Sequence, residues 1–202
     1  MSVPWQPASD ARGLLLVGGG PAAVAAWVRR GLVACHVLPL GRWTAVVPAE
    51  AVSRALPPYD DAVTVLAARP VPHRLRPGVG AFASDGRAVL TVQPRGWRGG
   101  QRWLVWEPGQ GVVVAPGLVQ ARPDDLVRAA GRGRGIGAVL ADPSGDAHDL
   151  LRRVMGALGL PGIEMLHDGG VGPVIIPRAK TVSRFDARAT EDARHRAELE
   201  EG

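Results

Sequence analysis

The stretch LLLVGGGPAAVAAWVRRG, residues Leu14–Gly31, decides how the chain begins to fold. Four apolar residues are followed by three glycines, and then by an alanine-rich run that opens with Pro21. An apolar run that ends at glycine favours a buried strand, and the fixed φ of proline suits the first turn of a helix. We therefore expect a strand over Leu14–Val17, a tight turn, and a helix over Pro21–Arg30.

The same turn matches the glycine pattern Gly-x-Gly-x-x-Gly/Ala through Gly18, Gly20 and Ala23. In this feature the stretch resembles flavin-dependent and nicotinamide-dependent oxidoreductases, and the resemblance implies a dinucleotide whose pyrophosphate lies at the helix N-terminus. Such enzymes place an acidic residue about 20 residues beyond the glycines to bind the ribose. Here residues 38–40 are Leu-Pro-Leu, and residues 11–49 contain no carboxylate. We therefore expect a strand-to-helix turn and no cofactor.

The rest of the first third alternates between short apolar runs and turn residues. The predicted elements after the first helix are strands at Ala34–Leu40 and Trp43–Pro48, a helix at Glu50–Leu56 and a strand at Ala62–Ala68. A tight turn at Gly41 and Arg42 makes the first two of these strands antiparallel. The order is β-α-β-β-α-β, the arrangement called ferredoxin-like.

An antiparallel meander is predicted next. Asp85 and Gly86 lie between two alternating runs and predict a hairpin, and Pro108–Gly111 predicts a second one. Helices follow, one with Asp125 in its first turn and one capped by Ser144 or Asp146. Short strands are expected at 138–141 and within 163–170.

These patterns predict an α+β fold with four regions. Residues 1–12 form an N-terminal tail, 13–72 the ferredoxin-like unit, 73–176 the meander with its helices, packed on the first unit, and 177–202 a charged C-terminal helix or tail. Within the last region three apolar residues recur at helical spacing and predict one docking face for a partner protein. They are Val182, Phe185 and Ala189.

No complete catalytic or metal-binding set is found in the sequence. Cys35 and His36 are adjacent in a predicted strand, so their side chains point to opposite faces and cannot form a nucleophile–base pair. A group of acidic and histidine residues lacks the spacing of a known metal motif. Its members are Asp142, Asp146, His148, Asp149, His167 and Asp168. We expect no catalytic residue, no metal and a non-enzymatic protein.

The single cysteine and the lack of a long apolar run indicate the cellular compartment of the protein. One cysteine excludes a disulfide framework within the chain, and no segment approaches the 18 or so apolar residues of a membrane helix. No signal-peptide pattern occurs at the N-terminus. We therefore expect a soluble, cytoplasmic protein that does not bind membranes.

Positive charge is concentrated in the middle of the chain. The formal net charge is +5, and residues 69–134 carry 11 basic against 4 acidic side chains. Arginine and glycine alternate in two loops, 94–103 and 131–137, where guanidinium groups can neutralise phosphates and an indole can stack on a base. The residues predicted to bind nucleic acid or phosphate are Arg95, Trp97, Arg98, Arg102, Arg132 and Arg134.

Three functional hypotheses follow, in this order. The first is a non-catalytic module that acts through protein–protein interaction, self-association or assembly. The alternative is binding of nucleic acid or a phosphorylated ligand through the two arginine–glycine loops. The third is a dinucleotide-binding enzyme that uses Gly18–Ala23.

Overall fold

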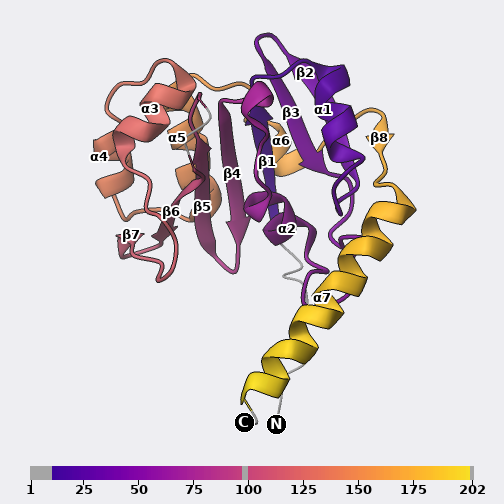
Figure 1. Cartoon of the computed structure of the whole chain (residues 1–202). Helices are drawn as coiled ribbons and strands as arrows, with labels where there is room; N and C mark the ends of the chain where they lie inside the picture. The colour runs from indigo at the N-terminus through magenta and orange to yellow at the C-terminus, as the bar shows by residue number, and fades with distance from the viewer. Residues whose placement is uncertain (1–10, 97–99, 201–202) are drawn as a thin grey trace.

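One antiparallel sheet with helices on both faces forms the body of the protein (Figure 1). The computed structural model describes residues 11–96 and 100–200. The sheet has eight strands in the order β7-β6-β5-β4-β1-β3-β2-β8. The predicted α+β class is therefore confirmed.

The elements alternate along the chain before the helices take over. In order they are β1 (Arg12–Val17), α1 (Pro21–Val28), β2 (Cys35–Leu40), β3 (Trp43–Pro48), α2 (Ala62–Ala68), the 3₁₀ helix η1 (His73–Leu75), β4 (Gly78–Ser84), β5 (Arg87–Gln93), β6 (Arg102–Glu107), β7 (Gly111–Val113), α3 (Pro123–Ala130), α4 (Ile136–Ala141), α5 (Ala147–Leu158), α6 (Met165–Asp168), β8 (Val174–Ile175) and α7 (Ala179–Glu200).

The N-terminal strand lies in the middle of the sheet. β1 pairs with β3 on one side and with β4 on the other, both antiparallel. β2 pairs with β3 through the predicted tight turn at Gly41 and Arg42, so β3 separates β2 from β1. A doubly wound dinucleotide-binding sheet requires the strand after the first helix to lie beside the first strand. Here the strand after α1 is β2, and it does not lie beside β1.

Two predicted elements of the first third are wrong. Ala62–Ala68 is not a strand but helix α2, because the Asp61 side chain caps its N-terminus by accepting a 2.5 Å hydrogen bond from the Thr64 amide. Glu50–Leu56 is not a helix but an irregular segment with one isolated bridge, between Val52 and Asp61. The strand that follows α2 is β4.

The later elements confirm some predictions and correct others. The hairpin turn at Asp85 and Gly86 is present with positive φ at both residues, as the tight turn requires. Asp146 caps α5 through the Asp149 amide. However, residues 138–141 belong to helix α4 and residues 165–168 to helix α6, and the short edge strand is β8.

The continuous apolar run of β1 is explained by burial on both faces. Leu14 and Leu16 point into a core shared with α3, α4, α5 and α6. Leu15 and Val17 point into a second core under α1 and α2. A strand in the middle of a sheet that is covered on both sides has no polar face, because neither set of side chains meets water.

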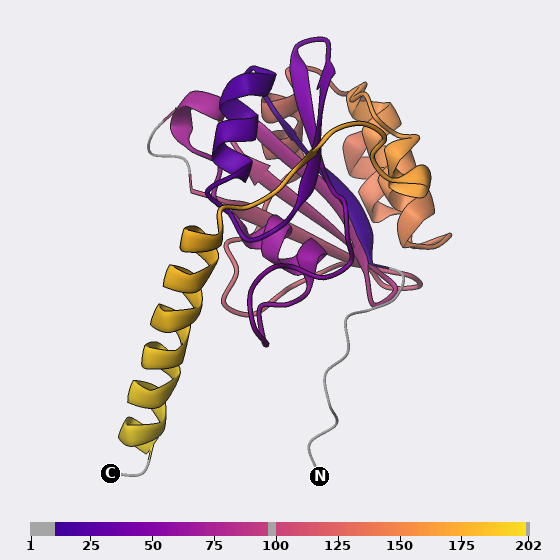
Figure 2. The ribbon, with the colours of Figure 1, turned by 90° about the vertical axis from the view of Figure 1, so that its right-hand side faces the viewer.

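Helix α7 leaves the body and projects away from it (Figures 1 and 2). Its first half docks: the Phe185 ring meets the Tyr59 ring edge-on at 5.1 Å, and Asp186 accepts a hydrogen bond from the Leu56 amide. Residues 190–199 are all exposed. Among the described residues, no helix, α7 included, is both long and apolar enough to cross a membrane.

Candidate nucleic-acid interface

Four connections leave the sheet at the same end, and the strand register proves it. Val17 at the end of β1 lies opposite Thr44 and Gly78, and Gly78 lies opposite Gln93. Since β6 begins beside the end of β5, the connections 18–20, 41–42, 69–77 and 94–101 all emerge here. We call this end of the molecule, together with the connection 131–135, the basic end.

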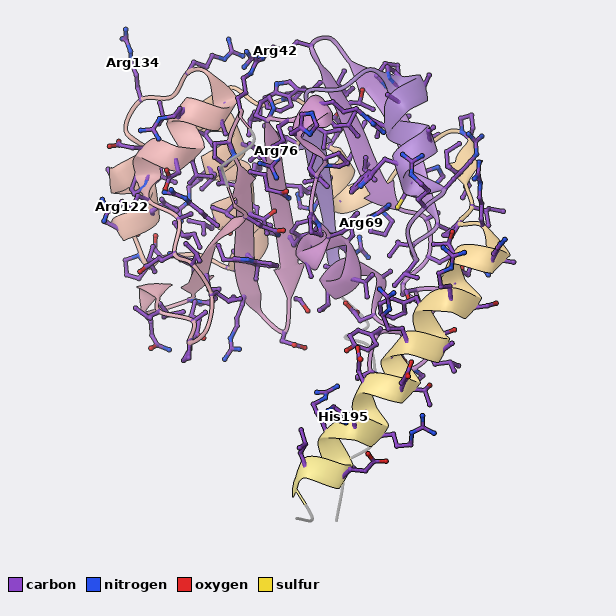
Figure 3. The ribbon with its side chains drawn as sticks, viewed as in Figure 1. Arg42, Arg69, Arg76, Arg122, Arg134 and His195 are labelled. Atoms are coloured by element: carbon purple, nitrogen blue, oxygen red, sulfur yellow. The ribbon has the colours of Figure 1, made fainter. Side chains whose placement is uncertain are left out.

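The connection between α3 and α4 belongs to this end because Arg42 reaches it. The Arg42 guanidinium donates to the Ala130 carbonyl at the end of α3. A Cβ atom added at Gly131 would lie 3.2 Å from the same guanidinium. Figure 3 shows Arg42, Arg76 and Arg134 toward this same end. The two arginine–glycine loops predicted from the sequence are thus on one end of the sheet.

These five connections carry arginine and no carboxylate. The arginines in their described parts are Arg42, Arg69, Arg74, Arg76, Arg95, Arg132 and Arg134. At the opposite end the connections 29–34, 49–61 and 85–86 are of mixed sign, with Glu50, Asp60, Asp61 and Asp85 beside three arginines. The positive potential is therefore concentrated at one end of the sheet.

Several arginines of the basic end are oriented by backbone carbonyls. Arg76 donates to the carbonyls of Val71 at 2.9 Å and Gly96 at 3.0 Å, and Arg132 donates to the carbonyl of Gly159 at 2.5 Å. A carbonyl accepts a hydrogen bond but carries no net charge. Hydrogen bonds to carbonyls thus orient these guanidinium groups without themselves placing a carboxylate beside them.

Three further arginines of this end point into solvent. Arg74, Arg95 and Arg134 are exposed and form no ion pair with any residue that the structure describes. By contrast, several arginines outside the five connections pair with carboxylates. They are Arg54, Arg87, Arg102, Arg128, Arg152 and Arg153.

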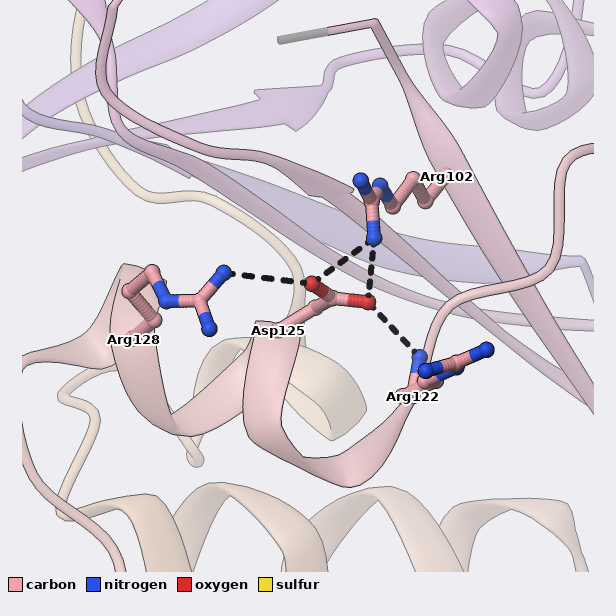
Figure 4. Close-up of polar contacts among 4 residues, drawn as sticks. All are labelled: Arg102, Arg122, Asp125 and Arg128. Carbon is pink, nitrogen blue, oxygen red and sulfur yellow. Dashed lines mark hydrogen bonds and ion pairs between the residues drawn. The ribbon is translucent and has the colours of Figure 1, made fainter.

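Arg102 is engaged by a buried carboxylate beside the basic end (Figure 4). Its Nη1 donates to both oxygens of Asp125 at 2.9 Å, and the Arg122 amide donates to the same carboxylate at 2.9 Å. Burial raises the pKa of the Asp125 carboxyl, but the hydrogen bonds and the charges of Arg102 and Arg128 outweigh it and hold that pKa below its ordinary value. Arg102 thus has a structural partner, whereas Arg95 and Arg134 pair with no carboxylate in residues 11–96 and 100–200.

Arg69 also has a structural position within the basic end. Its guanidinium lies 3.8 Å from the centre of the Trp27 ring and donates to the Trp27 carbonyl. Burial lowers the pKa of Arg69 to about 10. Of the other predicted residues, Trp97 and Arg98 lie outside the described part of the chain.

The glycine turn after β1 is filled by protein. A side chain on Gly18 would meet Pro77 at 2.8 Å, and one on Gly19 would meet Leu75 at 2.3 Å. The Gly18 amide donates to the Pro77 carbonyl, and Thr44 donates to the Gly19 carbonyl. Gly18 and Gly19 therefore allow the 75–77 segment to approach, whereas a side chain at Gly20 would meet nothing within 4 Å.

The other candidate residues do not come together as a reactive site. Burial raises the pKa of the Cys35 thiol to about 12, and the ring of His36 is bound to the Gly172 carbonyl instead. His148 and His167 stack at 5.8 Å, but within residues 11–96 and 100–200 no three metal-ligating side chains gather.

The predicted partner-binding face of α7 is turned toward the protein itself. Val182, Phe185 and Ala189 are half-buried, as are Thr181 and Asp186, whereas residues 183–184 and 187–188 are exposed. The helical spacing of these residues therefore has an explanation within the chain, through Phe185 and Tyr59.

Sequence reasoning missed four arginines of the basic end, Arg42, Arg69, Arg74 and Arg76. All four lie outside the predicted loops 94–103 and 131–137, in connections that end 17 or more residues before residue 94, and only the strand register brings them close. A signal was present in the sequence, since none of the five connections contains an acidic residue.

The function of this chain is inferred from the geometry of the basic end. Comparisons with known proteins found no family whose model matches this chain, no curated protein similar to it and no solved structure that resembles it.

Proposed function

We propose that this protein is a non-catalytic module that binds single-stranded nucleic acid at the basic end. The observation that carries the proposal is that five connections bring arginines to one end without a single carboxylate. Phosphate contacts by exposed guanidinium groups release condensed counterions, and this release supplies most of the affinity of such proteins for nucleic acid.

A chain of phosphates fits the basic end better than a single phosphate does. The arginines extend from the β2–β3 turn, at Arg42, to the β5–β6 connection, at Arg95, so no single group can contact all of them. The sequence also places Trp97 between Arg95 and Arg98. An indole among arginines favours unpaired bases, because stacking requires an exposed base face.

We also assign the first six main elements to the ferredoxin-like arrangement and the protein to the cytoplasm. The strand order β4-β1-β3-β2, with antiparallel neighbours and with α1 and α2 over the same core, supports the arrangement. The buried free thiol of Cys35 supports a reducing compartment.

Salt dependence tests the proposed function directly. Binding of a fluorescent 12-nucleotide oligo-dT would be measured by anisotropy over a series of salt concentrations. The triple variant R74Q/R95Q/R134Q removes three exposed charges of the basic end. If each contacts one phosphate, the slope of log affinity against log salt falls in magnitude by about 2, since each contact to a single strand contributes about 0.7.

A matched variant separates local contacts from total charge. R29Q/R178Q/R188Q removes the same charge at exposed positions outside the basic end. We expect its salt slope to remain that of the unmodified protein. Equal effects of the two triple variants, or no binding by the unmodified protein at low salt, would reject the proposed interface.

A second candidate function is self-association or protein binding through α7. The observation that favours it is the exposed second half of this helix, residues 190–199, which projects from the body (Figure 2). Light scattering after gel filtration would show a dimer that a chain ending at residue 189 does not form. A monomer at every concentration tested would leave α7 without a role in self-association.

A further inference from the structure

A groove opens at the basic end between the β2–β3 turn and the C-terminal ends of α3 and α5. Its volume is about 730 Å³, which lies in the range of small-molecule sites. Leu40 and Ile163 form apolar parts of its lining, while Arg42 and Arg132 contribute positive charge.

Glycines keep one wall of this groove open. Gly131, Gly156 and Gly159 all line it. Gly156 lies within helix α5, where a side chain is ordinarily favoured, and a side chain there would meet nothing within 4 Å. A side chain at Gly156 would therefore extend into the open space of the groove.

The two arginines give the groove a specific chemistry. The Arg42 guanidinium lies over the Trp43 ring at 5.2 Å, an arrangement that holds its plane in a defined orientation. Arg132 is fixed by its hydrogen bond to the Gly159 carbonyl. An apolar lining beside two fixed guanidinium groups suits a flat ring with an anion attached to it.

We propose that this groove holds one base of a nucleotide unit, whose phosphate pairs with Arg42 and Arg132. The inference rests on the proposed function and names a subsite within it. The chemistry recognised is a nucleobase that carries a phosphate, whether in a strand or as a free nucleotide.

Both arginines also cap helix ends, and capping leaves capacity for a ligand. A guanidinium has five N–H donors, and a carbonyl has two acceptor positions, so the bonds to Ala130 and Gly159 use only part of each group. The C-terminal ends of α3 and α5 each present about half a negative charge, against a full positive charge on each arginine. The mouth of the groove therefore remains attractive to a phosphate.

The test fills the groove without removing a charge. The G156W variant places an indole where the structure has open space, and G156A adds only a methyl group at the same position. A187W adds the same indole at an exposed position of α7, outside the basic end. Circular dichroism and thermal melting of each variant would verify that it folds.

Three probes distinguish the possible ligands: the 12-nucleotide oligo-dT, 5′-AMP and inorganic polyphosphate. We expect G156W to weaken oligo-dT binding about 5- to 100-fold, the range for loss of one stacked base, while G156A and A187W bind like the unmodified protein. Polyphosphate binding stays unchanged in all three variants. Saturable binding of 5′-AMP that G156W abolishes would extend the site to free nucleotides, and binding of oligo-dT alone would restrict it to strands.

Failure of this subsite is distinguishable from failure of the proposed function. If G156W binds oligo-dT as tightly as A187W does, the groove holds no base, while salt-dependent binding through Arg74, Arg95 and Arg134 still stands. If the unmodified protein binds none of the three probes, both proposals fall.

Discussion

Replacing Asp125 by asparagine tests whether the buried carboxylate beside the basic end stabilises the fold. The D125N substitution keeps the shape of the side chain and an oxygen that can still accept from the Arg122 amide. It removes the negative charge and sets an amide N–H₂ group against the Arg102 guanidinium, which can only donate. One of the two hydrogen bonds of Arg102 and the attraction between the two charges are therefore lost, while the oxygen that caps the helix is retained.

The expected cost follows from the geometry of the pair. A hydrogen bond to a charged group contributes about 1.5–3 kcal/mol. The Arg102 side chain is 38% exposed, whereas that of Asp125 is 5% exposed, so water screens part of the interaction. We expect D125N to lower the free energy of unfolding by about 1–2 kcal/mol, which for a chain of this size lowers the Tm by about 2–8 °C.

Urea denaturation followed by tryptophan fluorescence would measure the change, with D124N as the control. Asp124 is exposed in the same first turn of α3, so D124N removes an equal charge from the helix N-terminus without touching Arg102. We expect D124N to cost only a few tenths of a kcal/mol, as for a surface charge near a helix end. The difference between the two variants isolates the contacts of the Asp125 charge with Arg102 and, at 3.7 Å, with Arg128.

The effect of D125N must also depend on pH, with a definite sign. Because the pKa of Asp125 is lowered in the folded state, its contribution is complete above the unfolded value of about 3.9 and is lost as the pH falls through the folded value. The gap between the protein and D125N should therefore narrow below pH 4. An equal cost for D124N and D125N, or a gap that persists undiminished at pH 2, would refute this account of Asp125.

Three further predictions concern the turn after β1, the cysteine and the last helix. G18A should cost about 1–3 kcal/mol because its methyl group would meet Pro77 at 2.8 Å, whereas G20A, with nothing within 4 Å, should be nearly neutral in the same urea assay. Cys35 should react with a thiol reagent at pH 8 only after unfolding, because burial raises the pKa of its thiol to about 12. F185A should release α7 from Tyr59 and speed proteolysis within α7, while the melting of the body changes little.

Local signals in the sequence predicted those elements whose structure depends on neighbouring residues. Asp85 and Gly86 specify a tight hairpin turn by their backbone preferences alone, and Asp146 caps α5 as predicted. Ala62–Ala68 was mistaken for a strand because valine and threonine favour strands, yet the Asp61 cap and burial of one helical face decide for a helix. Propensity was overridden there by a cap that the sequence does contain.

The candidate interface was predicted only in part because it depends on distant pairings. The loops holding Arg95 and Arg134 were recognised from their composition, but their shared location follows from the register of β4, β5 and β6 and from the reach of Arg42. The ion pair of Arg102 could not be predicted, since its partner Asp125 is 23 residues away in the sequence and no local pattern links the two residues. Asp125 itself was expected only at a helix start.

The edge strands of the sheet limit how this chain can associate with other chains. The outer strands β7 and β8 are three and two residues long, and Pro177 follows β8 closely. Strands this short offer few unpaired amides and carbonyls to a neighbouring backbone, and proline removes one donor more. Even when crowded, the protein should resist joining edge to edge into fibrils, and lasting associations would have to form through side chains.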